Sequence, residues 1–208
     1  MIFADRIDAG ERLAKGLAHL AGSECVVLAI PRGGGIVGEV IARALGAPLD
    51  VVVPRKIGAP GNPELAIGAV APGIRVLDPR MVGALGVTDR YLEREIAEQE
   101  AEIDRRQRAY RGGRPPQPVE GRVAIVVDDG VATGSTAVAA LRWARARGAE
   151  RVVLAVPVAP PQSLERLRAE ADEVVVLETP QPFLAVGEWY RDFDQTTDEQ
   201  VVSALARS

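Results

Sequence analysis

Residues 123–136 read VAIVVDDGVATGST, and this stretch decides the fold of the 208-residue chain. Its first five residues are all apolar, which is typical of a strand buried on both faces of a parallel sheet. Two acids and a run of small residues follow, and a helical pattern then extends from about Ser135 to Arg147. We therefore predict a strand, a short glycine-containing loop and a helix in direct succession.

Apolar runs alternate with helical patterns on both sides of this stretch. Strands are expected at 25–31, 49–53, 151–156 and 173–177, and helices at 8–21, 162–170 and from Gly35 to Leu45. The alternation predicts an α/β fold, in which a parallel Rossmann-like sheet is flanked by helices. Such sheets bind ligands beyond the carboxyl ends of their strands. The turn after residue 30 and the loops after 53 and 127 should therefore lie close together.

Two segments depart from the alternation. Prolines and glycines crowd residues 54–68, which we interpret as a loop, and 65–70 with 74–77 then form a small hairpin. A long polar helix is expected at 88–111, with Thr88 as its N-cap. Its apolar positions fall seven residues apart: Ile96, Ile103 and Tyr110. One narrow stripe on a charged helix usually marks a surface helix that lies on its own domain or on a partner. The favoured interpretation is a solvated helix, and a homodimer contact is the alternative.

Composition limits the function classes. We expect one domain over residues 1–208, with a core at about 22–178 and a hood-like C-terminal segment at 179–208. The formal net charge of −4 argues against a nucleic-acid binder, which usually carries a strongly basic face. No apolar run approaches the roughly 20 residues of a membrane span, and no signal peptide is recognisable. We expect a cytoplasmic protein with no membrane contact.

The loop after residue 127 has the properties of an anion site. The first amides of a helix have no helical partners, and with the helix dipole they attract a phosphate. Hydroxyl donors come from Thr133, Ser135 and Thr136. Asp128 and Asp129 would repel a phosphate, so they should face something else, such as ribose hydroxyls or a hydrated Mg²⁺. The stretch therefore predicts a site for a sugar phosphate.

This combination of strand, acid pair and A-T-G-x-T loop resembles the PRPP-binding signature of the type I phosphoribosyltransferases. The resemblance spans about residues 25–178 and implies that Asp128 and Asp129 contact the ribose hydroxyls and, indirectly, an Mg²⁺ that binds with PRPP. It implies a 5-phosphate cradle of Val131, Ala132, Thr133, Gly134, Ser135 and Thr136. Some purine-salvage members carry a second carboxylate where this chain has Ala132. The general base for the acceptor therefore stays unassigned.

Two further segments resemble parts of the same family. Arg32, Gly33 and Gly34 match the pyrophosphate-binding loop, in which a cis peptide is common, and consecutive glycines suit an anion nest. The alternative is a simple helix-capping turn. Arg55 and Lys56 match a mobile basic loop that closes over PRPP, which would make them catalytic together with the two aspartates. The alternative is a solvated basic pair.

Aromatic residues are concentrated in the C-terminal segment: Phe183, Trp189 and Tyr190. Family members stack the acceptor base under a variable hood, and an aromatic ring suits a flat base. The favoured alternative is that these rings anchor the tail on the core, since large apolar rings are mostly buried.

The resemblance implies that PRPP and a nitrogen acceptor, expected to be a nucleobase, give a ribonucleotide and pyrophosphate. The main alternative is a non-catalytic protein that binds PRPP or a nucleotide and regulates a partner, because a fold does not fix a function. A hydrolase or kinase-like enzyme on the same phosphate site, and a scaffold assembled through the helix at 88–111, are further alternatives.

Overall fold

The computed structural model describes residues 2–207 and contains two sheets. The larger sheet has five strands in the order β2-β1-β6-β7-β8, and every neighbouring pair is parallel. Its strands are β1 (Cys25–Ala29), β2 (Leu49–Val51), β6 (Val123–Val127), β7 (Arg151–Val158) and β8 (Glu173–Glu178). The predicted α/β class and parallel sheet are confirmed.

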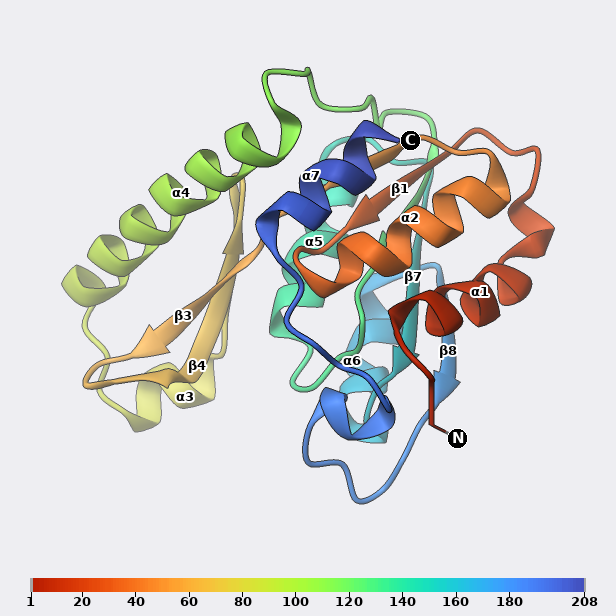
Figure 1. The fold of residues 1–208 in the computed structure, drawn as a ribbon. Helices are drawn as coiled ribbons and strands as arrows, with labels where there is room; N and C mark the ends of the chain where they lie inside the picture. The colour runs from red at the N-terminus through yellow and green to blue at the C-terminus, as the bar shows by residue number, and fades with distance from the viewer. Residues whose placement is uncertain (1, 208) are drawn as a thin grey trace.

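Helices cover both faces of this sheet (Figure 1). One face is covered by α1 (Arg6–Gly16), α2 (Gly33–Leu45) and α7 (Asp198–Ala206), and the other by α5 (Ser135–Ala146) and α6 (Pro161–Glu170). Successive strand residues divide between the two cores: Val27 and Ile125 pack with the first group of helices, whereas Val26 and Ala124 pack with the second. This burial on both faces explains why the strands are continuous apolar runs.

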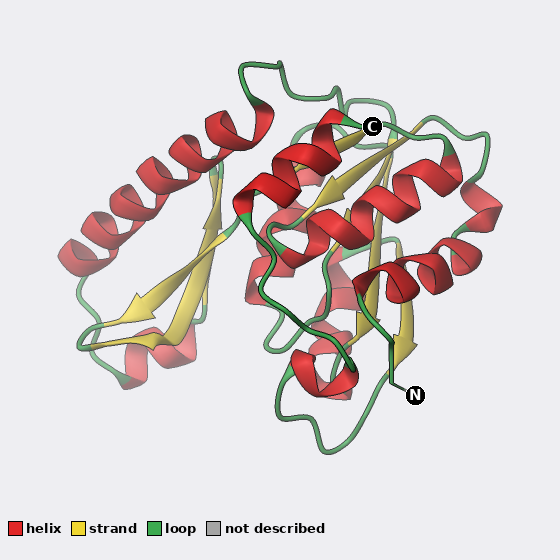
Figure 2. Cartoon of the chain, in the orientation of Figure 1, coloured by secondary structure: helices red, strands yellow, loops and turns green. Residues whose placement is uncertain are grey.

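A second lobe lies beside the main sheet (Figure 2). It consists of the antiparallel strands β3 (Arg55–Ala59), β4 (Asn62–Ala71) and β5 (Ile74–Leu77), with α3 (Pro79–Ala84) and α4 (Asp89–Arg111). The interpretation of 54–68 as a loop was wrong, because most of it pairs in the β3–β4 hairpin. Register shifts at Gly58 and a turn at Gly61 accommodate the glycines and prolines that suggested a loop.

The long polar helix is confirmed, with the Thr88 hydroxyl accepting a hydrogen bond from the Tyr91 amide. Its buried residues are Leu92, Ile96, Ile103 and Tyr110. They join the core that contains Ile57 and Ile67 of the hairpin and Val201 of α7. The apolar stripe is therefore buried within the chain itself.

The C-terminal segment holds more structure than its composition suggested. It contains the short 3₁₀ helix η2 (Val186–Trp189) and α7, and another 3₁₀ helix, η1 (Ala18–Leu20), follows α1. A capping box between Thr197 and Gln200 begins α7. Residues 3–4 and 189–192 are joined by backbone hydrogen bonds, so the tail runs beside the start of the chain.

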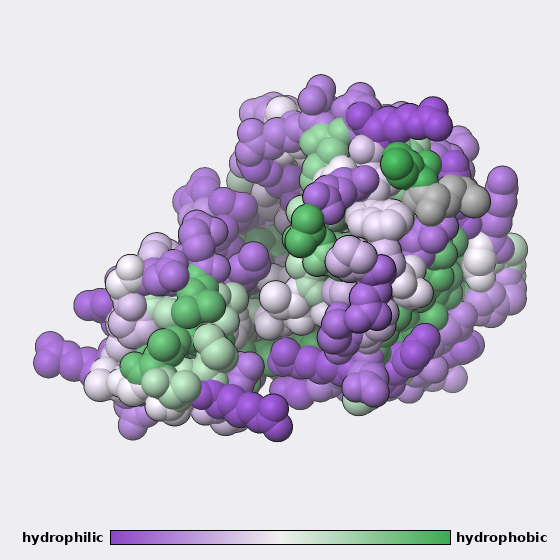
Figure 3. Space-filling view, turned by 90° about the horizontal axis from the view of Figure 1, so that it is seen from below, coloured by the Kyte–Doolittle hydropathy of each residue, from purple (hydrophilic) through white to green (hydrophobic). Residues whose placement is uncertain are grey.

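The surface is mostly hydrophilic in the view of Figure 3, and apolar residues gather in small separate patches. Among residues 2–207, no helix has both the length and the apolar character that a membrane span requires.

Candidate functional site

A cleft of about 480 Å³ opens where β1 and β6 end. It is lined by the turn after β1, the acid pair after β6, the start of α5 and the C-terminal tail. The lining residues are Arg6, Ile30, Pro31, Arg32, Gly33, Pro54, Asp128, Asp129, Thr136, Phe193, Gln195 and Thr196. The predicted convergence of the segments after residues 30, 53 and 127 is thus seen in the structure.

The two aspartates are held in a defined arrangement. One carboxylate oxygen of Asp128 accepts the backbone N–H of Asp129 at 2.9 Å, and Asp129 Oδ2 accepts Arg6 Nε at 2.8 Å. Burial and the neighbouring Asp129 raise the pKa of Asp128 well above its usual range. Burial also raises the pKa of Asp129, and Arg6 opposes that rise. Burial therefore opposes ionisation of both carboxyl groups, and Arg6 offsets part of that effect.

Arg6 is a cleft residue that the sequence did not predict. It stands at the start of α1, whose N-cap Asp5 accepts hydrogen bonds from the amides of Ile7 and Asp8. Arg6 lies 123 positions from Asp129 in the sequence, and no local pattern distinguishes it from the other arginines. Only the packing of α1 against α2 brings it to the cleft.

The turn after β1 packs directly against the acids. The Pro31–Arg32 peptide is cis, as the resemblance implies, and α2 begins at Gly33. A Cβ atom on Gly33 would lie 1.8 Å from Asp129 Oδ2, and one on Gly34 would lie 2.7 Å from the Val127 carbonyl oxygen. Arg32 and Gly33 line the cleft, whereas Gly34 is buried behind them. These glycines are needed for close packing of the turn on the acid pair.

The loop before α5 leaves its helix start open. Gly134 adopts φ 81°, and within residues 2–207 no side chain caps the start of α5. Ala132 and Thr133 are exposed, while Ser135 and Thr136 are half-buried. Val131 differs from the rest, because its side chain is buried and its amide donates to the Val158 carbonyl oxygen at 2.9 Å. The segment available to an anion is therefore Ala132–Thr136.

The structure does not bring Arg55 and Lys56 to this cleft. Both lie on β3 in the second lobe, and neither is a lining residue. The Nε atom of Arg55 donates to Gln99 Oε1 of α4 at 2.9 Å, and burial lowers the pKa of Arg55. Lys56 is exposed. In this conformation Arg55 is part of the packing of the lobe.

The predicted aromatic residues Phe183, Trp189 and Tyr190 are not among the residues that line the cleft. Tyr190 is 6% exposed and packs on Phe3, with ring centroids 5.4 Å apart. Phe183 and Trp189 pack partly buried against the same cluster. This burial favours the interpretation that these rings anchor the tail. The aromatic ring that reaches the cleft is instead Phe193, which is 36% exposed.

The metal-ligating side chains at the cleft suit a metal ion that binds together with a phosphate-bearing ligand. Within residues 2–207, no three acidic, histidine or cysteine side chains come together as a metal site. The acid pair supplies only two carboxylates, and one of them is already paired with Arg6. Mg²⁺ characteristically uses one or two carboxylates, waters and substrate phosphates. The pair therefore fits Mg²⁺ only as a partner of a bound phosphate ester.

Comparisons with known proteins show which family this chain resembles. Residues 3–188 match the family described as phosphoribosyl transferase domain. A protein of Mycobacterium tuberculosis H37Rv, named as a candidate phosphoribosyl transferase, is 48% identical over all 208 residues. The chain spans 47% of the length of that relative.

Solved structures share the fold. The crystal structure of TT1426 from Thermus thermophilus is similar with a TM-score of 0.84 and 49% identity, covering 100% of this chain and 99% of that one. A hypothetical protein from Neisseria gonorrhoeae, solved with bound ppGpp, has a TM-score of 0.51 and 12% identity, covering 100% of this chain and 98% of that one. The second likeness concerns the fold alone.

Proposed function

Because the chain belongs to the phosphoribosyl transferase domain family, we propose that it transfers the 5-phosphoribosyl group of PRPP to a nitrogen acceptor and releases pyrophosphate. One observation carries the proposal: Thr136 at the open start of α5 and the acid pair after β6 line the same cleft. A phosphate and the sugar attached to it need these two kinds of group side by side.

The residues divide into three roles. Amides and hydroxyls of Ala132–Thr136 hold the 5-phosphate, because a helix start offers unpaired N–H donors and a favourable dipole. Asp128 and Asp129 accept hydrogen bonds from the ribose hydroxyls. Arg32 and the amide of Gly33 face the pyrophosphate, and the guanidinium can donate two parallel hydrogen bonds to phosphate oxygens. Val131 and Gly34 support these groups through packing.

The chemistry follows from this placement. The bond between C1 of the ribose and the pyrophosphate oxygen breaks, and pyrophosphate leaves with the electron pair. The acceptor nitrogen then forms the new bond to C1, which has gained positive character, and the proton of that nitrogen passes to solvent or to the departing pyrophosphate. Arg32 stabilises the negative charge that develops on the leaving group, and the cleft holds the acceptor in line with C1. A covalent intermediate with the protein is not required.

We further propose that Mg²⁺ binds together with PRPP. Asp128 and Asp129 would hold it from the ribose side, through water or the hydroxyls, while the phosphate oxygens supply its other ligands. When bound, it would neutralise charge on the departing pyrophosphate.

The acceptor in this proposal is a nucleobase. Phe193 brings a ring that is 36% exposed to the cleft. Arg6 lies over this ring and the Tyr190 ring centroid is 4.9 Å away, so a base would contact the part of the ring that these two residues leave exposed. Gln195 also lines the cleft, and a glutamine side chain can both donate and accept hydrogen bonds. Those two properties match the edge and face of a base.

Binding and turnover test the proposal separately. Calorimetry with PRPP and Mg²⁺ should show binding to the wild type and at least about tenfold weaker binding to Asp129→Asn and Thr133→Val, since tenfold corresponds to about 1.4 kcal/mol. Asp104→Asn, at an exposed position of α4, is the matched control and should bind normally. Equal affinity in all four proteins would remove the site assignment.

The alternative is a regulatory protein that binds PRPP or a nucleotide without turnover. Incubation with PRPP, Mg²⁺ and a panel of purine and pyrimidine bases should release pyrophosphate with at least one base. Tight PRPP binding without release on any base would favour the regulatory function.

A further inference from the structure

Three interactions of Arg6 converge at the edge of the cleft. Its Nε atom donates to Asp129 Oδ2 at 2.8 Å, and its Nη1 atom donates to the carbonyl oxygen of Asp194 at 2.8 Å. Its guanidinium carbon lies 4.0 Å from the centroid of the Phe193 ring. The side chain is only 12% exposed. One residue from α1 thus contacts both the acid pair and the tail.

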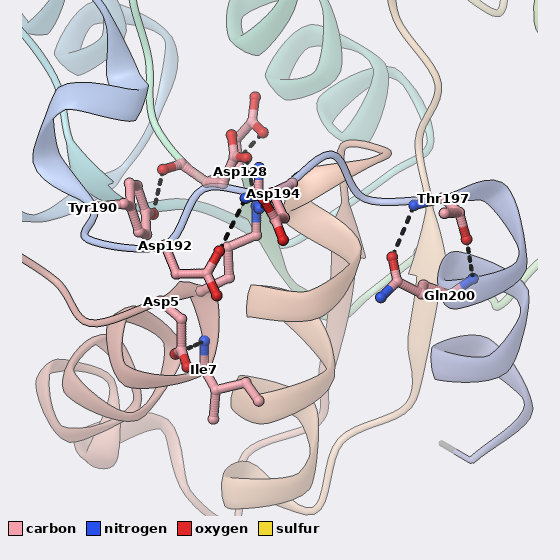
Figure 4. A network of polar contacts seen from close by, with 10 residues as sticks. Asp5, Ile7, Asp128, Tyr190, Asp192, Asp194, Thr197 and Gln200 are labelled. Carbon is pink, nitrogen blue, oxygen red and sulfur yellow. Dashed lines mark hydrogen bonds and ion pairs between the residues drawn. The ribbon is translucent and has the colours of Figure 1, made fainter.

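The neighbouring structure keeps this arrangement in place. A Cβ atom on Gly33 would lie 2.9 Å from Arg6 Nε, so the missing side chain leaves room for the guanidinium. Tyr190 joins the tail to the same aspartate, because its hydroxyl donates to the Asp129 carbonyl oxygen at 2.5 Å. Figure 4 shows the tail from Tyr190 to Gln200 passing close to Asp128. Asp129 is therefore held from two directions.

The shape of the arginine side chain matters here. A guanidinium carries donors on separate edges, whereas a lysine ammonium is a single point charge. Arg6 uses one edge for Asp129 and another for Asp194. A lysine at this position can replace the ion pair with Asp129 but cannot hold both acceptors in the same relative position.

These contacts link two parts of the cleft. Arg6 pairs with one of the two oxygens of the Asp129 carboxylate, and in the proposed function the other oxygen would accept a hydrogen bond from a ribose hydroxyl. The tail supplies Phe193, Gln195 and Thr196 to the same cleft. We propose that Arg6 is a positioning residue, which couples PRPP binding at Asp129 to the order of tail residues 193–196 on the acceptor side. This inference rests on the proposed function, since it takes PRPP as the ligand of Asp129.

The experiment measures PRPP affinity and tail protection in the same proteins. Calorimetry with PRPP and Mg²⁺ gives the affinity, and hydrogen exchange of the amides in 190–196 gives the order of the tail with and without PRPP. In the wild type, PRPP should slow exchange in 193–196. Arg6→Ala should bind PRPP about tenfold more weakly and show no PRPP-dependent slowing.

The Arg6→Lys variant tests the coupling between Asp129 and the tail separately from PRPP affinity. It should bind PRPP within about threefold of the wild type, yet exchange in 193–196 should not slow on binding. Arg43→Ala, on the exposed face of α2 with a side chain 73% exposed, is the matched control and should behave like the wild type. Normal tail protection in Arg6→Lys or in Arg6→Ala would overturn the coupling role.

Measurements on the ligand-free proteins test this inference independently of the proposed function. If the wild type fails to bind PRPP, the proposed function fails. Exchange in 193–196 of ligand-free Arg6→Ala still reports on the link, and it should exceed the wild-type rate. Equal rates in the free proteins would overturn the link between Arg6 and the tail, whatever the ligand of the site is.

Discussion

The Tyr190 hydroxyl donates a hydrogen bond to the backbone carbonyl oxygen of Asp129 at 2.5 Å. The ring belongs to the C-terminal tail, and the carbonyl belongs to the acid pair that follows β6. Burial, and the negative charge of Asp129, raise the pKa of Tyr190, so the phenol remains a donor under ordinary conditions. This bond makes the tail part of the support of the cleft.

Tyr190→Phe keeps the packing on Phe3 and removes only this bond. We expect a loss of about 1 kcal/mol in the free energy of unfolding, measured by urea titration, together with weaker PRPP binding in calorimetry. Tyr91→Phe is the matched control, because Tyr91 donates to the Gly58 carbonyl oxygen at 2.9 Å in the second lobe. It should lose similar stability and keep its PRPP affinity. Equal affinity losses in both variants would contradict a local role for Tyr190.

Gly33→Ala should lower PRPP affinity strongly and reduce the stability of the fold only moderately. The new Cβ would lie 1.8 Å from Asp129 Oδ2, so the carboxylate has to move. We expect PRPP affinity to fall at least about tenfold, with a stability cost of about 1–3 kcal/mol. Gly83→Ala, where the new Cβ would meet no atom outside its own helical segment within 4 Å, should leave the PRPP affinity unchanged and should not lower the stability. Normal PRPP binding in Gly33→Ala would show that Asp129 needs no fixed position.

Arg55 and Lys56 should respond differently to alanine. Arg55→Ala removes the hydrogen bond to Gln99 and should lower stability by about 1 kcal/mol. Lys56 is exposed, so Lys56→Ala should change stability by less than about 0.5 kcal/mol. If the hairpin closes over PRPP, Lys56→Ala should nevertheless reduce pyrophosphate release in the base panel. Unchanged release in that variant would remove Lys56 from the catalytic residues.

Tyr110 makes stability depend on pH in the alkaline range. Its hydroxyl donates to Asp198 Oδ1 at 2.7 Å, which ties α4 to the start of α7. Burial and Asp198 raise the pKa of Tyr110 to about 12. An unfolded tyrosine loses its proton near pH 10, so the folded state binds the extra proton between about pH 10 and 12. The free energy of unfolding should fall across that window.

Tyr110→Phe is the comparison for this pH effect. It should lose about 1.5–3 kcal/mol at neutral pH, as expected for a hydrogen bond to a charged group. Its stability should fall less steeply than that of the wild type between about pH 10 and 12. Urea titrations of both proteins at several pH values measure the difference. Parallel pH profiles would contradict the assignment of the proton to Tyr110.

The parts of the molecule that could be predicted are those whose sequence patterns lie in contiguous residues. The parallel strands were continuous apolar runs, and the acid pair with its glycine-containing loop occupies contiguous residues, so both could be recognised without tertiary information. The hairpin at 55–71 was missed because its buried residues, such as Ile57 and Ile67, are interspersed with prolines and glycines. Those residues usually break structure, but here they occupy the turn and an irregular register.

The other side of the cleft could not be predicted, because it depends on distant contacts. Arg6 and Phe193 come from opposite ends of the chain, and the guanidinium meets the ring only after α1 and the tail have packed together. The sequence marks Tyr190 as an aromatic residue of the tail, but composition does not show whether its ring is buried as an anchor or exposed at the cleft. The nearby Phe193 reaches the cleft, and only three-dimensional packing distinguishes the two.

The hydrogen bond from Arg6 to Asp194 spans 188 positions of the chain. Proteins are synthesised from the N-terminus, and domains generally fold as units while synthesis proceeds. The five-stranded sheet is complete by Glu178, yet one wall of the cleft is supplied only by residues 193–196. A nascent chain can therefore form the loop before α5 and the acid pair before residues 193–196 have been synthesised, and the cleft is complete only after those residues have joined it.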